Sequence, residues 1–115
     1  MTKKCWKVKI TVVKLTTFKE IYGDNAPLHD RPEISSGKCP DFKEGQEFII
    51  DNIGALPPQG FCAWAWSDIY RHVYAMMLGG DPFWMKETGA CLTCCTDGLN
   101  PVMFKVERIE PAIET

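Results

Sequence analysis

Long apolar runs are absent from this sequence of 115 residues, which predicts that no segment spans a membrane. Lys3 and Lys4 stand near the N-terminus, but the apolar core of a signal peptide does not follow them. We therefore expect a cytoplasmic protein with no membrane partner.

A strong net charge is also missing. The chain has 13 Lys and Arg against 15 Asp and Glu, which leaves a formal charge of -2. Such a balance creates no field that would attract nucleic acid. Lysines outnumber acidic residues in the first twenty positions, but they alternate with apolar residues, so we interpret them as the solvated face of a strand. We expect no nucleic-acid partner.

The composition that remains is typical of one folded domain spanning residues 1–115. Hydrophobic residues make up 45% of the chain and charged residues 24%. A chain of this length buries roughly two-thirds of the surface that its unfolded form exposes, so it needs no covalent staples. In a cytoplasmic protein, the six cysteines are therefore expected as free thiols, metal ligands or redox groups rather than as disulfides.

One amphipathic helix organises the predicted fold. We place it at about residues 63–78, beginning at Ala63 or at Ser67, with Ser67 or Asp68 as a possible cap, and ending before Gly79 and Gly80. Its predicted core stripe, at spacings of three and four, consists of Trp66, Ile69, Tyr70, Val73, Met76 and Met77. Its predicted polar face carries Ser67, Asp68, Arg71, His72 and Ala75.

Strand patterns account for most of the remaining chain. Residues 5–15 alternate, with Trp6 expected on the face of Val8 and Cys5 on the opposite face. A short strand is expected at residues 46–51, and the Asp97-Gly98 turn predicts a C-terminal hairpin of residues 90–96 and 101–110. The predicted fold class is α+β, a small and mainly antiparallel sheet or open barrel covered by one main helix.

The other segments are expected to be irregular. Residues 16–39 form a long loop, with one short helical turn near Phe18 to Tyr22. The turn at residues 81–86 is expected to fold back over the core with its two aromatic side chains. Residues 111–115 are expected to be a frayed tail.

Several segments together resemble a family of small prokaryotic proteins for which no activity is assigned. They are CPxFxxGQEF at residues 39–48, GFCxWAWxDIY at residues 60–70, GGDxxWM at residues 79–85 and CTDGxxPVxFKxER at residues 95–108. The resemblance covers about residues 39 to 110 and leaves the loop at residues 16–38 unmatched. It implies a small prokaryotic cytosolic protein and carries over no catalytic residue.

The cysteines of the first hairpin strand are the first candidate for chemistry. Cys91, Cys94 and Cys95 contain a C-x-x-C motif, which could form part of a zinc or iron–sulfur site if it lay in a turn. In a strand, alternation points Cys91 and Cys95 to one face and Cys94 to the other. We therefore expect no metal and no cofactor at these thiols, with zinc or iron–sulfur binding as the alternative.

A second candidate is a nucleophilic site. If the hairpin turn packed against the polar face of the helix, Cys95 could act as a thiolate with His72 as its base. Asp97 or Asp68 could then orient the imidazole. The competing interpretation is that Asp97 builds the turn while Asp68 pairs with Arg71 or His72 on a solvated surface.

Aromatic residues form the third candidate. Seven of the thirteen lie within residues 61–84, more than one helix face can cover. The excess predicts a subunit interface or an apolar pocket. The residues that we assign to this ligand or interface site are Trp64, Trp66, Asp68, Tyr70, Phe83 and Trp84.

These observations favour a small binding or assembly module. It would form a homo-oligomer through the aromatic-rich helix region and could hold a small-molecule ligand. The alternative is an enzyme, or a thiol-redox or metal protein, that uses the Cys91, Cys94 and Cys95 strand with Asp97 and His72.

Overall fold

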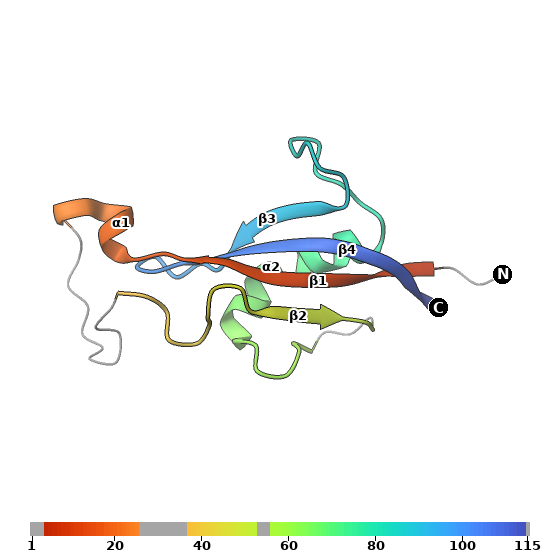
Figure 1. Ribbon diagram of the computed structural model, residues 1–115, viewed down its shortest axis with the longest axis horizontal. Helices are drawn as coiled ribbons and strands as arrows, with labels where there is room; N and C mark the ends of the chain where they lie inside the picture. The colour runs from red at the N-terminus through yellow and green to blue at the C-terminus, as the bar shows by residue number, and fades with distance from the viewer. Residues whose placement is uncertain (1–3, 26–36, 53–55, 115) are drawn as a thin grey trace.

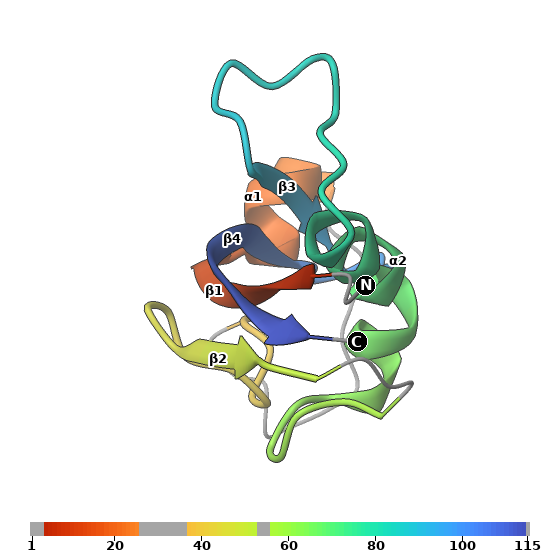
Figure 2. The same ribbon diagram turned by 90° about the vertical axis from the view of Figure 1, so that its right-hand side faces the viewer.

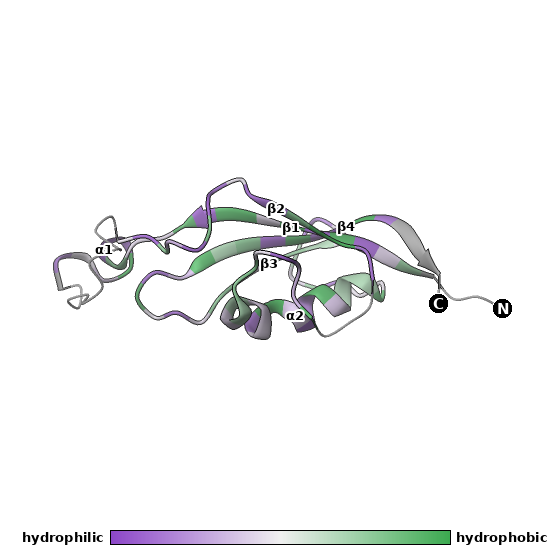
Figure 3. Cartoon of the chain, turned by 90° about the horizontal axis from the view of Figure 1, so that it is seen from below, coloured by the Kyte–Doolittle hydropathy of each residue, from purple (hydrophilic) through white to green (hydrophobic). Residues whose placement is uncertain are grey.

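The architecture is one four-stranded antiparallel sheet with one long helix against it. A computed structural model describes residues 4–25, 37–52 and 56–114. The sheet order is β2-β1-β4-β3, so the two longest strands lie at its centre. Figures 1 and 3 show α2 lying along one face of the sheet. The predicted α+β class, with its open sheet, covering helix and C-terminal hairpin, is confirmed.

The described residues form four strands, two α-helices and one short 3-10 helix. Their bounds are β1 (Lys4–Leu15), α1 (Phe18–Tyr22), η1 (Gly23–Asn25), β2 (Glu47–Ile50), α2 (Ala63–Met77), β3 (Ala90–Cys94) and β4 (Val102–Glu114).

α1 confirms the helical turn expected near Phe18. It begins with a capping box, in which the Thr17 hydroxyl accepts from the Glu20 N–H and the Glu20 carboxylate accepts from the Thr17 N–H, both at 3.0 Å. The rest of the predicted loop, residues 26–36, lies outside the described residues.

The core lies between the sheet and α2. Ile69 and Val73 of α2 are fully buried, as is Phe104 of β4. The alternating apolar residues of β1 and β4 meet the helix stripe, which explains why this sheet face is covered. The sheet contributes Val8, Ile10, Val12, Val102, Phe104 and Val106, and the helix contributes Ala65, Trp66, Ile69, Val73, Met76 and Met77.

Two predictions about β1 are wrong because its pairing with β4 is irregular. Its register with β4 shifts between Cys5 and Trp6, between Lys7 and Val8, and between Val12 and Lys14. At the first two shifts the extra residue lies on β4, and the regular alternation of β1 is broken between Cys5 and Val8; only at the third shift does β1 carry the extra residue, Val13. Cys5 is therefore buried, and Trp6, expected beside Val8, lies partly exposed with the Arg108 guanidinium 5.7 Å from its ring centre.

β4 continues through the segment that was expected to fray. Lys4 pairs with Glu114, Cys5 with Ile113 and Trp6 with Pro111, so β4 extends to Glu114 and the predicted tail is wrong over residues 111–114. A proline has no N–H to donate, and strands tolerate it at a bulge. The register shift between Cys5 and Trp6 lies at Pro111. Thr115 lies outside the described residues.

The helix starts at the earlier of its two predicted positions. α2 begins at Ala63 after Cys62, and no side chain caps it, so Ser67 and Asp68 are not caps. The Ser67 hydroxyl donates to the Trp64 carbonyl at 2.8 Å. At the other end, Gly79 has a φ of 90° and stops the helix as predicted. The predicted stripe is confirmed except at Tyr70, which is 41% exposed.

The segment between α2 and β3 does not fold back over the core. Figure 2 shows it as a loop that projects from one edge of the molecule. Phe83 is 94% exposed and Trp84 is 70% exposed, and their rings pack edge to face at 5.1 Å. The expectation is wrong because Met76 and Met77, both almost fully buried, already fill the core at this end of α2.

Candidate functional site

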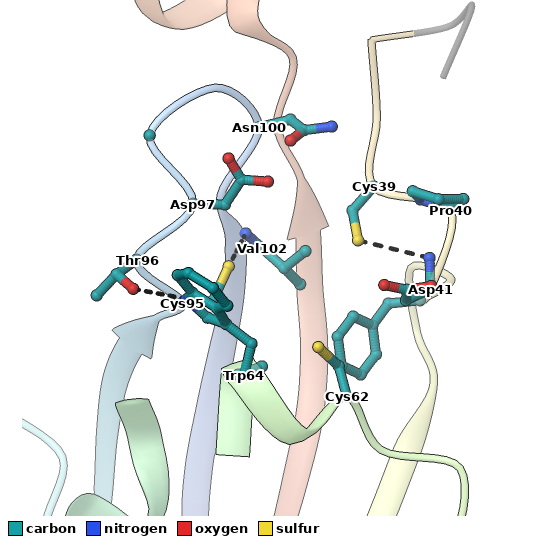
Figure 4. A pocket seen from close by; sticks show the side chains of 13 residues that line it. Cys39, Pro40, Asp41, Cys62, Trp64, Cys95, Thr96, Asp97, Asn100 and Val102 are labelled. Carbon is teal, nitrogen blue, oxygen red and sulfur yellow. Dashed lines mark hydrogen bonds between the residues drawn. The ribbon is translucent and has the colours of Figure 1, made fainter. Parts of the chain in front are cut away.

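A pocket of about 410 Å³ opens where three segments far apart in the sequence meet. The first segment precedes β2, the second forms the start of α2, and the third is the turn between β3 and β4. Each segment contributes one cysteine, so we call this cavity the thiol pocket (Figure 4). Its described lining residues are Cys39, Pro40, Asp41, Phe42, Cys62, Trp64, Ala65, Cys95, Thr96, Asp97, Gly98, Asn100 and Val102.

The first wall is the turn at residues 39–42. The Asp41 N–H donates to the Cys39 sulfur at 3.5 Å, which holds this thiol over the turn. Phe42 is buried, with its ring 5.3 Å from that of Phe104 in an edge-on contact. Aromatic pairs with this geometry stabilise a core by about 0.5–1.5 kcal/mol beyond their burial. The turn is therefore fixed to the sheet by Phe42.

The second wall is the first turn of α2. Cys62 occupies the N-cap position, and its carbonyl accepts from the Trp66 N–H at 2.9 Å. Trp64 is 65% exposed, yet its indole is held in place because Nε1–H donates to the Thr96 hydroxyl at 2.9 Å. The indole thus connects the helix to the opposite wall of the pocket.

The third wall is the turn that follows β3. The Cys95 N–H donates to the Val102 carbonyl at 3.2 Å, and the Val102 N–H donates to the Cys95 sulfur at 3.3 Å. One Asp97 oxygen accepts from the Leu99 N–H at 3.0 Å, the pattern of an Asx turn. The Tyr22 hydroxyl donates to the Gly98 carbonyl at 2.5 Å and attaches α1 to the same turn.

Asn100 joins this turn to the first wall and is almost fully buried. In the amide orientation that satisfies both of its partners, its nitrogen donates to Asp97 at 2.6 Å and its oxygen accepts from the Cys39 N–H at 3.2 Å. A buried amide satisfied on both sides makes the position of its neighbours specific. Cys39 and Asp97 are therefore held at a fixed separation.

Asp68 links α2 to the hairpin, as one of the sequence hypotheses required. Its Oδ2 accepts from the Thr96 N–H at 2.8 Å, and its two oxygens lie 3.0 and 3.2 Å from the Thr96 hydroxyl. The hydroxyl can donate to this carboxylate while it accepts from Trp64. The resulting chain of hydrogen bonds runs from the indole through Thr96 to Asp68.

His72 does not complete a catalytic arrangement with these residues. It is partly buried, and burial followed by the nearby Arg71 charge lowers its pKa. No hydrogen bond joins the imidazole to Cys95, Asp97 or Asp68, all of which lie in the described part of the chain. The structure brings Cys95 and Asp97 together in the thiol pocket and connects Asp68 to it through Thr96, and it leaves His72 apart.

The cysteine strand has the alternation expected from the sequence. Cys91 and Cys95 are buried, whereas Cys94 is exposed on the other face. Burial raises the pKa of Cys91, and burial, Cys95 and Asp68 raise that of Cys94. Across residues 4–25, 37–52 and 56–114, no three side chains of His, Cys, Asp or Glu are arranged to hold a metal ion.

The thiols of the pocket are close enough to influence one another. Burial is the largest cause that raises the pKa of Cys39, and the hydrogen bond from Asp41 partly offsets it. The Asp41 carboxylate and the charges that Cys95 and Cys62 would carry as thiolates raise it further. At neutral pH, Cys39 is therefore a neutral, polarisable thiol rather than a nucleophile.

Apart from Tyr70, which is exposed on α2, the aromatic residues predicted for one site divide into three groups. Trp66 is buried in the core and cannot form an interface. Trp64 lies at the thiol pocket, at the start of α2, whereas Phe83 and Trp84 lie on the loop that follows the end of α2. A helix of 15 residues is roughly 22 Å long, so Trp64 and the Phe83–Trp84 pair belong to separate surfaces.

Sequence reasoning missed Cys39, Cys62, Asp41 and Asn100 as residues of the site. It grouped cysteines that are neighbours in the chain, whereas the fold groups cysteines from three distant segments. A signal was present, because Cys39, Cys62 and Cys95 each belong to one of the quoted motifs at residues 39–48, 60–70 and 95–108. Treating these motifs as walls of one cavity would have identified the pocket.

Comparison of the chain with protein-family models, with curated protein sequences and with solved structures finds no match. The family resemblance of the motifs therefore stays a prediction. Among the helices in the described residues, none has the length and apolar character needed to cross a bilayer.

Proposed function

We propose that this chain is a small cytosolic binding module that holds a small ligand in the thiol pocket and associates with copies of itself through exposed aromatic side chains. The observation that carries this proposal is the pocket of about 410 Å³. Sites for small molecules have volumes of about 300–1,000 Å³ and combine an apolar lining with a few polar groups. Phe42, Ala65 and Val102 supply the apolar lining, and Thr96 and Asp97 supply polar groups.

The pocket walls are fixed to one another before any ligand binds. Trp64 is bonded to Thr96 across the cavity, and Asn100 joins Asp97 to the Cys39 backbone. A site that is already ordered loses less conformational entropy when it binds. This supports binding as the role of the pocket, rather than a void left by imperfect packing.

The loop between α2 and β3 supports the second part of the proposal. Phe83 and Trp84 are exposed as an aromatic pair, and the nearby Leu78 is 71% exposed. Aromatic side chains on a fixed base are typical anchors of protein interfaces. Free thiols support a cytosolic location, because all six cysteines are unpaired and extracellular domains of this size usually pair theirs.

Protein-observed NMR with a library of small compounds tests the pocket. We expect compounds that shift the amide resonances of residues 39–42, 62–65 and 95–102 together. Cys62→Phe places a larger side chain at the pocket wall and should abolish these shifts. Cys94→Phe makes the same change at an exposed cysteine outside the pocket and should leave them intact. Shifts that are scattered over the surface, or unaffected by Cys62→Phe, would refute the proposal.

A thiol-redox role is the second candidate, favoured by the three cysteines around one cavity. Oxidation by hydrogen peroxide would join two of these thiols as a disulfide, with loss of two hydrogens from the protein and formation of two waters. Mass spectrometry and thiol titration after peroxide treatment separate the candidates. A binding module keeps its pocket thiols free, whereas a redox protein forms one disulfide that a dithiol reductant reverses.

A further inference from the structure

The described lining of the thiol pocket carries negative charge and no positive charge. Asp41 and Asp97 are among its residues, and no Lys, Arg or His is. Within the described chain, neither carboxylate forms an ion pair, and the Asp97 oxygens accept only from the neutral Leu99 N–H and Asn100 amide. Both aspartates thus leave their charges uncompensated at the edge of a cavity, where a ligand could neutralise them.

The uncharged lining groups are also those that interact favourably with a cation. The Trp64 indole is held by Thr96, and an indole attracts a cation to its ring face by about 0.5–1 kcal/mol at an exposed site. The Cys39 thiol remains neutral, because burial raises its pKa, and its sulfur is polarisable. Neither group carries a positive charge that could form an ion pair with an anionic ligand.

The dimensions and geometry of the pocket favour an organic cation over a metal ion. A volume of about 410 Å³ is far larger than a single ion requires. In the part of the chain that the structure describes, no three ligating side chains converge on one point. Phe42 and Val102 provide apolar surface that would contact a carbon skeleton and that a hydrated metal ion would not use.

We propose that the thiol pocket binds a small organic cation, an amine in its ammonium form, with Asp97 and Asp41 as counter-ions and the Trp64 ring face beside the ammonium group. This inference rests on the proposed function, because it assigns a ligand class to the same pocket. The ammonium group replaces water at the carboxylates, and the apolar part of the ligand occupies the space over Phe42.

Three probes of similar shape and different charge test the inference. They are 2-phenylethylammonium, the neutral 2-phenylethanol and the anion phenylacetate. Titrations of the reduced protein, followed by NMR and calorimetry, should show binding of the ammonium at residues 39–42, 62–65 and 95–102. We expect a dissociation constant at least about fivefold lower for the ammonium than for the alcohol, the contribution of one charge pair at 4 Å in water. Higher ionic strength should reduce this difference.

Variants assign the charges to the two carboxylates. Asp97→Asn and Asp41→Asn should each raise the dissociation constant of the ammonium about fivefold and leave that of the alcohol unchanged. Asp51→Asn is the matched control, because Asp51 is exposed at the end of β2 and does not line the pocket. It removes the same charge from the molecule and should change neither constant.

The outcomes separate this inference from the proposed function. If the alcohol or phenylacetate binds in the pocket as tightly as the ammonium, the cation inference is wrong and the binding function stands. If both aspartate variants bind the ammonium as tightly as the unchanged protein, the inference is also wrong. If none of the three probes shifts the pocket resonances while the wider library finds a ligand there, only the ligand class fails. If the library finds none either, both proposals fail.

Discussion

Arg108 of β4 donates two hydrogen bonds to Asp81, at 2.8 and 3.0 Å, across the base of the loop that carries Phe83 and Trp84. The same guanidinium donates to the Gly80 carbonyl at 2.7 Å, and Asp81 accepts from the Gly89 N–H at 2.5 Å. The two ends of the loop are therefore bonded to one another and to the sheet, whereas its aromatic tip is exposed.

Arg108→Lys should loosen this loop without unfolding the domain. Arg108 donates to Asp81 through Nη2 and to the Gly80 carbonyl through Nη1, and the single ammonium nitrogen of a lysine keeps the positive charge but cannot reproduce this two-nitrogen geometry. We expect faster cleavage by chymotrypsin after Phe83 and Trp84. Lys9→Arg, at the ion pairs of Lys9 with Glu47 and Glu107, is the control and should leave the rate unchanged. Equal cleavage rates in both variants would show that Arg108 does not hold the loop.

The Asp81 carboxylate should contribute to the acid sensitivity of the fold. The Gly89 N–H bond, and after it the Arg108 guanidinium, hold the pKa of Asp81 below its usual range. Its contribution to stability is present above the unfolded value of about 3.9 and is lost as the pH falls through the lower folded value. Urea unfolding as a function of pH should therefore show a smaller loss of stability on acidification for Asp81→Asn than for the unchanged protein. Parallel curves would contradict this assignment.

The two faces of α2 should differ sharply in their tolerance of truncation. Ile69 is fully buried, so Ile69→Ala should reduce the free energy of unfolding by about 2–5 kcal/mol. Arg71 is exposed, and Arg71→Ala should change it by less than about 0.5 kcal/mol. Denaturant midpoints at one fixed protein concentration measure both values. Large and equal losses would mean that the Arg71 face is also covered, for example by a second subunit.

Thr96 should position the Trp64 indole. Thr96→Val keeps the side-chain shape but removes the hydroxyl that accepts from Trp64 and faces Asp68. We expect a cost of about 0.5–1.5 kcal/mol in the free energy of unfolding and a clear shift of the Trp64 Nε1–H resonance. Thr93→Val, on β3, is the matched control and should leave that resonance in place. An unmoved indole signal in Thr96→Val would separate Trp64 from this network.

Association should depend on the loop rather than on Trp66. The double change Phe83→Ser and Trp84→Ser should give a monomeric mass by light scattering at micromolar concentrations, where we expect the unchanged chain to form a dimer or larger assembly. Leu92→Ser removes another exposed apolar side chain, on β3, and should preserve the assembly. A monomeric mass for the unchanged chain across this range would refute self-association.

The sequence predicted those parts of the fold that depend on local periodicity. Spacings of three and four identified α2, because the same face of a helix recurs at that period and only one side of α2 meets the sheet. The Asp97-Gly98 turn identified the hairpin, because its two strands are neighbours along the chain. Such features depend on residues that are close in sequence, so they can be predicted without tertiary contacts.

The remaining features depend on contacts between distant segments. The irregular pairing of β1 with β4, in which β4 carries an extra residue at two of the three register shifts, breaks the side-chain alternation that placed Trp6 beside Val8. The thiol pocket exists because the turn at Cys39 and the turn at Asp97 meet through Asn100. The turn with Phe83 and Trp84 was expected to fold back over the core, since hydrophobicity does not reveal that Met76 and Met77 already fill the core at this end of α2.

The central pairing of β1 with β4 has a consequence for how the chain folds. Partners such as Val8 and Arg108 lie roughly a hundred residues apart, so most of the chain must be present before the middle of the sheet can close. During synthesis, β1 leaves the ribosome long before β4, so the edge of β1 that pairs with β4 stays unpaired while the intervening chain is made. Such distant pairing predicts slow, late and cooperative folding. The nascent chain should therefore depend on chaperones until β4 has left the ribosome.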